Sequence, residues 1–221
     1  VVTTGVKTAD ILKRYTSFSD EKIAIGCALR YQYLYDFKLL PRRMAPENPF
    51  VVLVALEGQV EVASLLSYAI DQARELPDVK FKIRTHPVLT FKALLKFMGM
   101  NESDLPANIV VSNISKVAED IKECDVVLYW GTTVALEALM MGRPVIHFNR
   151  GDVLNYDPLF EFADFKWVMT RNGAMQEVLI EIQRLEDKDY LLLSNQGRSY
   201  VEQYLSRVNN SNMSNFLPDD D

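Results

Sequence analysis

Residues 125–148 read DVVLYWGTTVALEALMMGRPVIHF, and this stretch determines the fold class. A short apolar run, DVVLY, leads into Gly131 and two threonines. An apolar helical run follows, ends at Gly142, and gives way to a second strand-like run, PVIHF. Buried strands joined through a helix by short links are typical of a parallel sheet with helices on both faces. The stretch therefore predicts a strand–helix–strand unit of an α/β protein.

The same alternation extends along most of the chain. Strands are predicted at residues 50–56, 80–84, 109–112, 125–129, 144–148 and 166–169. Helices are predicted at residues 62–73, 91–98, 117–124, 132–141, 174–185 and 190–205. The sequence therefore predicts a doubly wound, Rossmann-like parallel sheet of about six strands.

Three segments are expected along the chain. Residues 1–48 read as a strand–helix–strand remnant of another lobe, followed by a proline-rich linker. Residues 49–207 form the main domain, and the polar residues 208–221 are expected to be disordered. The chain starts at Val1 within a strand-like run, so we expect it to be a piece of a longer protein. The alternating aromatics from Tyr31 to Phe37 favour a strand, with a domain or membrane interface as the alternative.

Composition narrows the functional classes. The 221 residues are 48% hydrophobic and 24% charged, typical of an ordinary globular chain, and the net charge of −6 argues against general nucleic-acid binding. No apolar run approaches the roughly 20 residues that span a bilayer, and no signal peptide is visible. We expect a cytoplasmic location, with peripheral association at the inner face of the membrane left open. Cys27 and Cys124 lack metal-ligand spacing and are expected to be buried thiols.

The turn after residues 125–129 carries the first candidate site. Gly131 allows a ligand close to the backbone, and Thr132 or Thr133 can cap the following helix. Free amides at a helix start attract phosphate. Glu137 lies one turn after Thr133 within an apolar helix, where a carboxylate needs a partner or a function. It can accept hydrogen bonds from the vicinal hydroxyls of a ribose; the alternatives are an ion pair or a solvent-facing side chain.

Here the sequence resembles a known group of enzymes. A strand, a Gly/Thr turn and TxxLEALxxGxPVI-type residues are similar to the donor-binding, carboxy-terminal lobe of two-lobed GT-B glycosyltransferases. The resemblance implies that Glu137 holds the donor ribose and that Gly131, Thr132 and Thr133 lie near its diphosphate or sugar. More weakly, it extends over residues 50–205, with residues 1–27 resembling the end of the amino-terminal lobe.

Two further turns fit this resemblance. Arg84, His86 and Pro87 resemble the Lys/Arg-x-His-Pro signature of bacterial capsule polysaccharide and polyglycerol-phosphate transferases. The cation and the imidazole would stabilise a diphosphate leaving group, although a lone histidine is as readily a structural residue. Gly58, in the turn after residues 50–56, would lie near the donor phosphates. Its neighbour Glu57 is a departure, because a carboxylate repels a diphosphate.

Other departures concern neighbouring families. Retaining members often carry a second glutamate seven residues before the first, and here that position is Trp130. Sugar 2-epimerases of this fold usually have a Gly-Gly pair, which Gly131-Thr132 does not match. Trp130 can stack on a base or sugar, but we expect it to line the crevice wall. His147 lies within a predicted strand, and we interpret it as structural.

The resemblance implies transfer of a sugar or glycerophosphate from a nucleotide-activated donor to a saccharide or lipid-linked acceptor in surface polysaccharide synthesis. The catalytic base would come from the amino-terminal lobe, so none is assigned, and this chain alone is expected to be inactive. We expect no cofactor, no metal site and no nucleic-acid partner. Two alternatives remain open: a nucleotide-sugar 2-epimerase of the same fold, and a non-enzymatic α/β module that binds a partner or small ligand.

Overall fold

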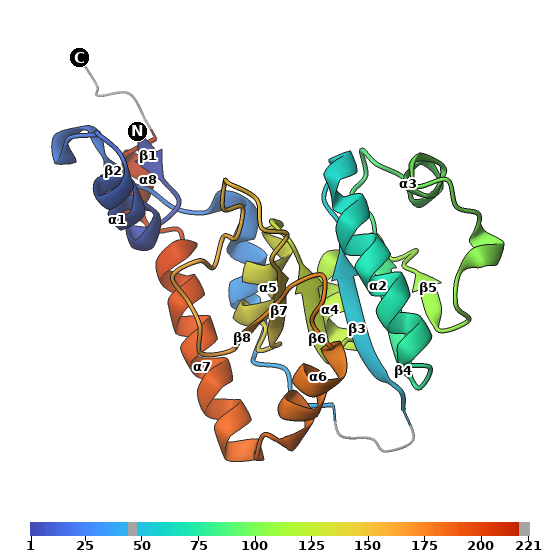
Figure 1. The fold of residues 1–221 in the computed structure, drawn as a ribbon. Coiled ribbons are helices and arrows are strands. Elements are labelled where there is room, and N and C mark those ends of the chain that lie inside the picture. Colours follow the sequence, from blue (N-terminus) through green and yellow to red (C-terminus); the bar gives the residue numbers. More distant parts are fainter. Residues whose placement is uncertain (44–47, 217–221) are drawn as a thin grey trace.

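The computed structural model of the chain describes residues 1–43 and 48–216 (Figure 1). Its main sheet has six parallel strands: β3 (Phe50–Ala55), β4 (Val79–Arg84), β5 (Ile109–Val111), β6 (Val126–Tyr129), β7 (Val145–Phe148) and β8 (Lys166–Met169). Their order across the sheet is β5-β4-β3-β6-β7-β8. The predicted fold class is confirmed, because each apolar run recognised in the sequence forms a strand of this parallel sheet.

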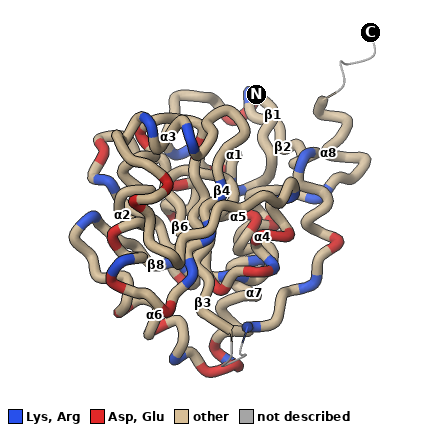
Figure 2. The backbone as a smooth tube through the Cα atoms, turned by 90° about the vertical axis from the view of Figure 1, so that its right-hand side faces the viewer, with Lys and Arg blue, Asp and Glu red and all other residues tan. Residues whose placement is uncertain are grey.

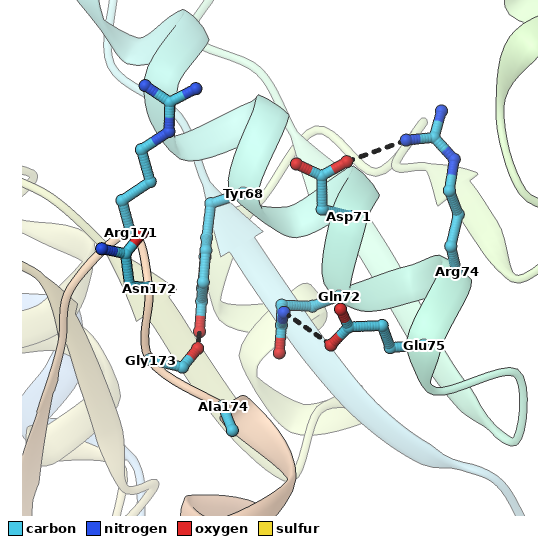
Figure 3. Close-up of a pocket in the computed structure, with 9 residues that line it drawn as sticks. All are labelled: Tyr68, Asp71, Gln72, Arg74, Glu75, Arg171, Asn172, Gly173 and Ala174. Atoms are coloured by element: carbon cyan, nitrogen blue, oxygen red, sulfur yellow. Dashed lines mark hydrogen bonds and ion pairs between the residues drawn. The ribbon is translucent and has the colours of Figure 1, made fainter.

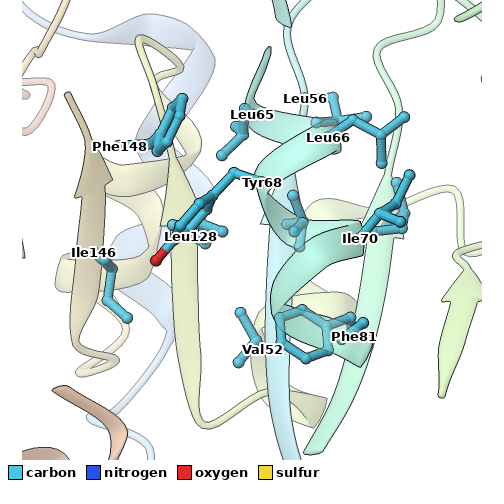
Figure 4. Close-up of a cluster of buried hydrophobic side chains, with 14 of the residues drawn as sticks. Val52, Leu56, Leu65, Leu66, Tyr68, Ile70, Phe81, Leu128, Ile146 and Phe148 are labelled. Carbon is cyan, nitrogen blue, oxygen red and sulfur yellow. The ribbon is translucent and has the colours of Figure 1, made fainter. Parts of the chain in front are cut away.

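Helices cover both faces of the sheet: α2 (Ala63–Glu75), α3 (Phe91–Phe97), α4 (Val117–Glu123), α5 (Val134–Met140), α6 (Met175–Arg184) and α7 (Asp187–Tyr204). Short 3₁₀ turns η3 (Val60–Val62) and η4 (Glu102–Asp104) precede α2 and follow α3. Strand side chains alternate between two cores. Val52 and Leu128 lie in a core with side chains of α2 (Figure 4), and α3 and α6 add to the same core. Leu53 and Tyr129 lie in the other core, with α4, α5 and α7. Burial on both faces explains why the strands are apolar throughout.

The order of the strands creates one switch point. The chain leaves β3 toward β4 and β5 on one side, then returns to place β6 against the other edge of β3. The loops that follow β3 and β6 therefore lead to opposite faces of the sheet, and the crevice between them, the usual ligand position in such folds, is lined by Gln59, Glu61 and Trp130. The candidate residues Gly58 and Gly131 are sequence neighbours of these lining residues.

A small second unit lies at one end of the molecule, beyond α7 (Figure 1). It consists of the parallel pair β1 (Val2–Thr3) and β2 (Ala24–Ile25), with α1 (Val6–Tyr15) and the 3₁₀ turn η1 (Asp20–Lys22) between them. The predicted strand–helix–strand unit is thus present. The Thr4 hydroxyl donates to the Tyr204 carbonyl at 3.0 Å, which ties the unit to the end of α7.

The predicted disorder of residues 208–221 is wrong for its first part. Residues Asn210–Ser214 form α8 beside β1 and β2 (Figure 1). The Asn209 side chain caps this helix by accepting from the Asn212 backbone amide at 2.9 Å, and the Asn215 side-chain amide donates to the Ile25 carbonyl at 2.9 Å. Asparagine, which looked like linker composition, acts here as cap and anchor. Residues 217–221 lie outside the described part of the chain.

The predicted aromatic strand is also wrong. Residues Leu29–Asp36 form the 3₁₀ helix η2, which is a strand of neither sheet. Its anchors are the buried Leu34 and the Tyr35 hydroxyl, which donates to the Leu205 carbonyl at 2.7 Å. The alternating tyrosines therefore do not mark the two faces of a strand. Tyr31 and Tyr33 bond to residues of the β6–α5 region, whereas Tyr35 bonds to Leu205.

A fully buried arginine attaches the following linker to the main domain. Arg143 is 2% exposed and donates to the carbonyls of Pro41 at 2.7 Å and Ile121 at 3.3 Å. The Leu40 amide donates to the Met141 carbonyl at 2.9 Å. Carbonyl oxygens thus satisfy the buried charge, as burial of a guanidinium requires. Residues 44–47 of the predicted linker, including Pro46, lie outside the described chain.

Two global properties bear on the functional classes. Acidic and basic positions are interspersed along the chain in Figure 2, without one continuous basic face in that view. Among the residues that the structure describes, no helix is both long enough and apolar enough to cross a bilayer. Both cysteines are buried free thiols, as the sequence predicted.

Gly142 gives a test of the local fold. It ends α5 with φ +83°, and an added Cβ would lie 3.0 Å from Cδ2 of Leu39. Gly99 has a similar φ of +68° but open space around it. We expect Gly99→Ala to lower the free energy of unfolding by about 1–2 kcal/mol through backbone strain alone, and Gly142→Ala to lower it further. Urea denaturation of both variants measures this; equal losses would contradict the packing of Leu39 on the helix end.

Candidate functional site

Strand register brings the candidate residues to one edge of the sheet. Ala55 at the end of β3 pairs with Arg84 on one side and Tyr129 on the other, and Tyr129 pairs with His147. The turns that follow these strands therefore start at the same level. Gly58 comes three residues after the end of β3, and His86 and Gly131 come two residues after the ends of β4 and β6, so the sheet brings all three to the same edge.

Glu57 binds the turn after β6. Its Oε1 accepts a hydrogen bond from the Gly131 amide at 2.7 Å, while its Oε2 is buried and has no hydrogen-bond partner among the described residues. Burial raises the pKa of the Glu57 carboxyl above its ordinary value. Glu57 thus accepts a hydrogen bond from the Gly131 amide, which lies in the turn where the sequence predicted a phosphate site.

Gly58 lies directly against His86. A Cβ built on Gly58 would be 2.8 Å from Nδ1 of His86, so only glycine fits without moving the imidazole. That Nδ1 also accepts from the Val88 amide at 3.3 Å, and the His86 side chain is exposed. The ring is therefore held at the crevice, and its other nitrogen, Nε2, remains available to a ligand.

Arg84 is already partnered. Its guanidinium forms an ion pair with Asp120 and donates to the carbonyls of Ile114 at 2.9 Å and Ser115 at 3.0 Å. Asp120 is completely buried and also pairs with Lys82 at 2.6 Å. This cluster joins the ends of β4 and β5 to α4. Arg84 is therefore less accessible to a ligand than the exposed His86, although the two residues are close in the sequence.

The threonines mark the start of α5. Thr133 is exposed, and its Oγ accepts from the hydroxyl of Tyr31 at 3.0 Å. The Thr132 Oγ accepts from the Val134 amide at 3.3 Å, so Thr132 is the residue whose side chain bonds the helix start. Of the two capping threonines left open by the sequence, only Thr132 makes that bond.

Glu137 is buried at the first turn of α5. It is 4% exposed, and its Oε2 accepts a hydrogen bond from the hydroxyl of Tyr33 in η2. Burial raises the pKa of the Glu137 carboxyl, while the Tyr33 bond and the charges of Arg30 and Arg84 oppose the shift. The carboxylate is thus neither in an ion pair nor facing water, the two structural alternatives considered from the sequence. Its partner, a tyrosine 104 residues away, left no local signal in the sequence.

A pocket of about 370 Å³ adjoins this edge at the ends of β6, β7 and β8. Trp130 is 5% exposed and forms one wall, as expected, with the Arg150 guanidinium 4.3 Å from its ring centroid. Asn149 and Asp152 add polar groups to the lining. Tyr156 packs on Gly131, whose added Cβ would lie 2.9 Å from it. The fold of this loop was not predictable from its residues, and its position after a buried strand was the one signal of a site.

His147 lies beneath that pocket within a buried polar cluster. Its Nδ1 is 3.7 Å from Asp157, and burial lowers the pKa of the imidazole. Asp157 accepts from the Tyr129 hydroxyl at 2.6 Å and from Lys166 at 2.7 Å. These contacts hold the loop 149–160 against the strand ends, which supports the interpretation of His147 as structural.

A second pocket lies between α2 and the loop after β8 (Figure 3). It measures about 590 Å³, and none of the predicted site residues lines it. The Tyr68 hydroxyl donates to the Gly173 carbonyl at 2.9 Å across it, and Arg74 is turned toward Asp71 at 2.8 Å. The Gln72 side chain likewise donates to Glu75 at 3.1 Å. Within residues 1–43 and 48–216, no cluster of three or more histidine, cysteine or acidic side chains is arranged to hold a metal ion.

Glu57 makes stability depend on pH. Because burial raises its pKa, the folded chain binds this proton more tightly than the unfolded chain, and the free energy of unfolding falls as pH rises through the folded pKa. We expect Glu57→Gln to be more stable than the wild type at neutral pH, with the difference vanishing below the unfolded pKa of about 4.3. Denaturant unfolding across pH measures this, with the exposed Glu61→Gln as control. A difference independent of pH would show that Glu57 carries no buried charge.

Solved structures of other proteins resemble the fold of this chain. No protein-family model matches the sequence, and no curated protein matches it. A glycosyltransferase from Rickettsia africae ESF-5 matches with a TM-score of 0.61 at 14% identity, over 98% of this chain and 61% of that one. A TarM variant of S. aureus, crystallised with fondaparinux, α-GlcNAc-glycerol and UDP, gives 0.56 at 14% identity, over 98% and 43%.

The glycotransferase of kitacinnamycin gives a TM-score of 0.52 at 15% identity, over 84% of this chain and 48% of that one. The chain therefore spans less than two thirds of the length of each of these three structures. Sequence identities this low establish the fold. The chain has the GT-B glycosyltransferase-like fold, with its six-stranded parallel sheet forming a Rossmann-like lobe.

Proposed function

We propose that this chain is the donor-binding lobe of a glycosyltransferase. In the proposed reaction, the bond between the donor's sugar, or glycerophosphate, and its nucleotide is broken, and an acceptor hydroxyl takes the transferred group. The nucleotide leaves with the electron pair, and the acceptor proton passes to a base outside this chain. A saccharide or lipid-linked acceptor, surface polysaccharide synthesis and a cytoplasmic location belong to the same proposal.

One observation supports it: a buried carboxylate, a histidine and two glycine turns all follow strands that end at the same edge of the sheet. Glu137 is 4% exposed on α5, His86 stands against Gly58, and Gly131 follows β6. A carboxylate suits a diol, a histidine suits a phosphate oxygen, and glycine turns let both approach the backbone. The pocket beside Trp130 offers about 370 Å³ next to this row for the transferred group.

Each residue then has a definite role. Glu137 accepts from the ribose hydroxyls, and Thr132 and Thr133 line the path of the diphosphate. His86 donates to the leaving phosphate, since its ring is exposed at the crevice. Arg84 adds its positive charge from within the Asp120 ion pair rather than by direct contact. Stabilising the charge that develops on the leaving group is the largest contribution a preorganised site of this kind makes.

One observation favours the non-enzymatic alternative. The Gly131 amide bonds to Glu57, Glu137 bonds to Tyr33, and Arg84 bonds to Asp120. A site whose polar groups are already satisfied gains less from a ligand, because each new bond replaces an old one. A module that binds a partner rather than a nucleotide would retain this closed arrangement. Nucleotide binding distinguishes the two functions.

The Glu137→Ala variant tests the proposed ribose contact. We expect it to weaken nucleoside diphosphate binding by about 1–3 kcal/mol, because the diol loses its acceptor. The fold should survive, since Tyr33 is 37% exposed and its hydroxyl can turn to water. Isothermal titration with UDP, GDP, CDP and ADP measures the loss, and the melting temperature reports the fold.

Glu119→Ala is the matched control, because this carboxylate lies on α4 and, among the described residues, pairs with Lys122 alone, at 2.8 Å. It should leave affinity unchanged. Wild-type affinity in Glu119→Ala together with wild-type affinity in Glu137→Ala would remove Glu137 from the site. Unfolding of Glu137→Ala would assign the residue a structural role.

A further inference from the structure

Two tyrosines of η2 reach over the start of α5. The Tyr33 hydroxyl donates to Oε2 of Glu137, and the Tyr31 hydroxyl donates to Oγ of Thr133 at 3.0 Å. The donors and acceptors are 104 and 102 residues apart in the chain. η2 therefore covers two residues of the proposed donor site from outside the Rossmann-like sheet.

The Tyr33 hydroxyl occupies one oxygen of the Glu137 carboxylate, Oε2. Glu137 is 4% exposed, and within the described residues Tyr33 is its single hydrogen-bond donor. Burial, followed by the bond to Glu137, raises the pKa of the Tyr33 phenol, so it remains a neutral donor. A vicinal diol that bonds both oxygens of this carboxylate competes with the phenol for Oε2.

The rest of η2 is fixed independently of Glu137. Leu34 is 1% exposed, and the Tyr35 hydroxyl donates to the Leu205 carbonyl at 2.7 Å. The Gln32 side chain donates to the Ala28 carbonyl at 2.9 Å and accepts from the Val208 amide at 2.8 Å. The backbone can therefore stay in place while the 37%-exposed Tyr33 side chain rotates toward solvent.

We infer that Tyr33 is a displaceable cover of Glu137, which a ligand with a vicinal diol opens by replacing the phenol. The inference rests on the proposed function, in which Glu137 holds the donor ribose. It assigns a regulatory role to a residue of the linker region. It also states the ligand class: a ribonucleotide exchanges one hydroxyl donor for another, whereas a ligand that lacks the diol leaves the cover closed.

The Tyr33→Phe variant tests this inference, because loss of the phenol hydroxyl should strengthen ribonucleotide binding rather than weaken it. In the wild type, ligand binding breaks the phenol–carboxylate bond; in the variant, no such bond exists to be broken. Bonds to charged groups are strong enough that we expect ribonucleoside diphosphates to bind the variant about tenfold more tightly, or more. Without ligand, the variant should melt at a lower temperature, because the buried carboxylate has lost its donor.

Two controls isolate the mechanism. Tyr35→Phe removes a phenol hydroxyl from the same segment that bonds the Leu205 carbonyl instead, and it should leave affinity unchanged. The 2′,3′-dideoxy form of the same nucleoside diphosphate should bind wild type and Tyr33→Phe equally. Calorimetric titration of the three proteins with both ligands gives all the required comparisons.

The outcomes separate this inference from the proposed function. If the wild type binds a ribonucleotide and Glu137→Ala weakens it, but Tyr33→Phe binds equally or less tightly, the cover is overturned while the donor site stands. An equal gain for the dideoxy ligand would also overturn it, because the effect would not involve the diol. If no variant binds any nucleotide, the proposed function fails and the cover fails with it.

Discussion

The pairing of Ala55 with both Arg84 and Tyr129 fixes the centre of the sheet, and the candidate site depends on it. Parallel strands end at the same edge, so this register decides which turns face one another. If the pairing of β3 slipped by one residue, Leu53 and Val54 would exchange the two faces of the sheet and thus the two cores. The same slip would move Glu57 away from the Gly131 amide. The buried faces therefore protect the geometry of the edge: packing of apolar side chains on both sides of β3 is what positions the polar ones beyond it.

At that edge, the chain satisfies its own polar groups. Glu57 takes the Gly131 amide, Tyr33 takes Glu137, and the completely buried Asp120 holds Arg84. Buried charges and dipoles need such partners, because desolvation without them is costly. A ligand at this crevice therefore binds by exchange, and its affinity is the difference between new and existing bonds. Exchange of this kind favours a ligand whose donors and acceptors match the displaced groups. The existing hydrogen bonds therefore increase the selectivity of the site and do not increase its affinity.

The sequence predicted what depends on local pattern. Continuous apolar runs such as residues 50–56 located the strands, because strands buried on both faces are apolar throughout. Gly142 located the end of α5, because a left-handed residue at a helix end favours glycine. It did not predict η2, where tyrosines at alternate positions serve different partners, or α8, where asparagines cap and anchor a helix. The partners of Glu57, Glu137 and Arg84 were not predictable either. They lie 74, 104 and 36 residues away, and no spacing within one element encodes such a contact. The proposed roles of Gly58, His86, Thr132 and Thr133 remain predictions that the geometry permits.

The central claim is that the crevice between the β3 and β6 turns is the donor site. Hydrogen–deuterium exchange of the backbone amides, with and without saturating nucleoside diphosphate, tests it most directly, since it locates binding without presupposing any one residue. The account predicts slower exchange in residues 57–58 and 131–137, with a change in η2 as its tyrosines move. Protection confined to the pocket between α2 and the loop 171–174, or no protection at any amide with any of the nucleotides, would contradict the account.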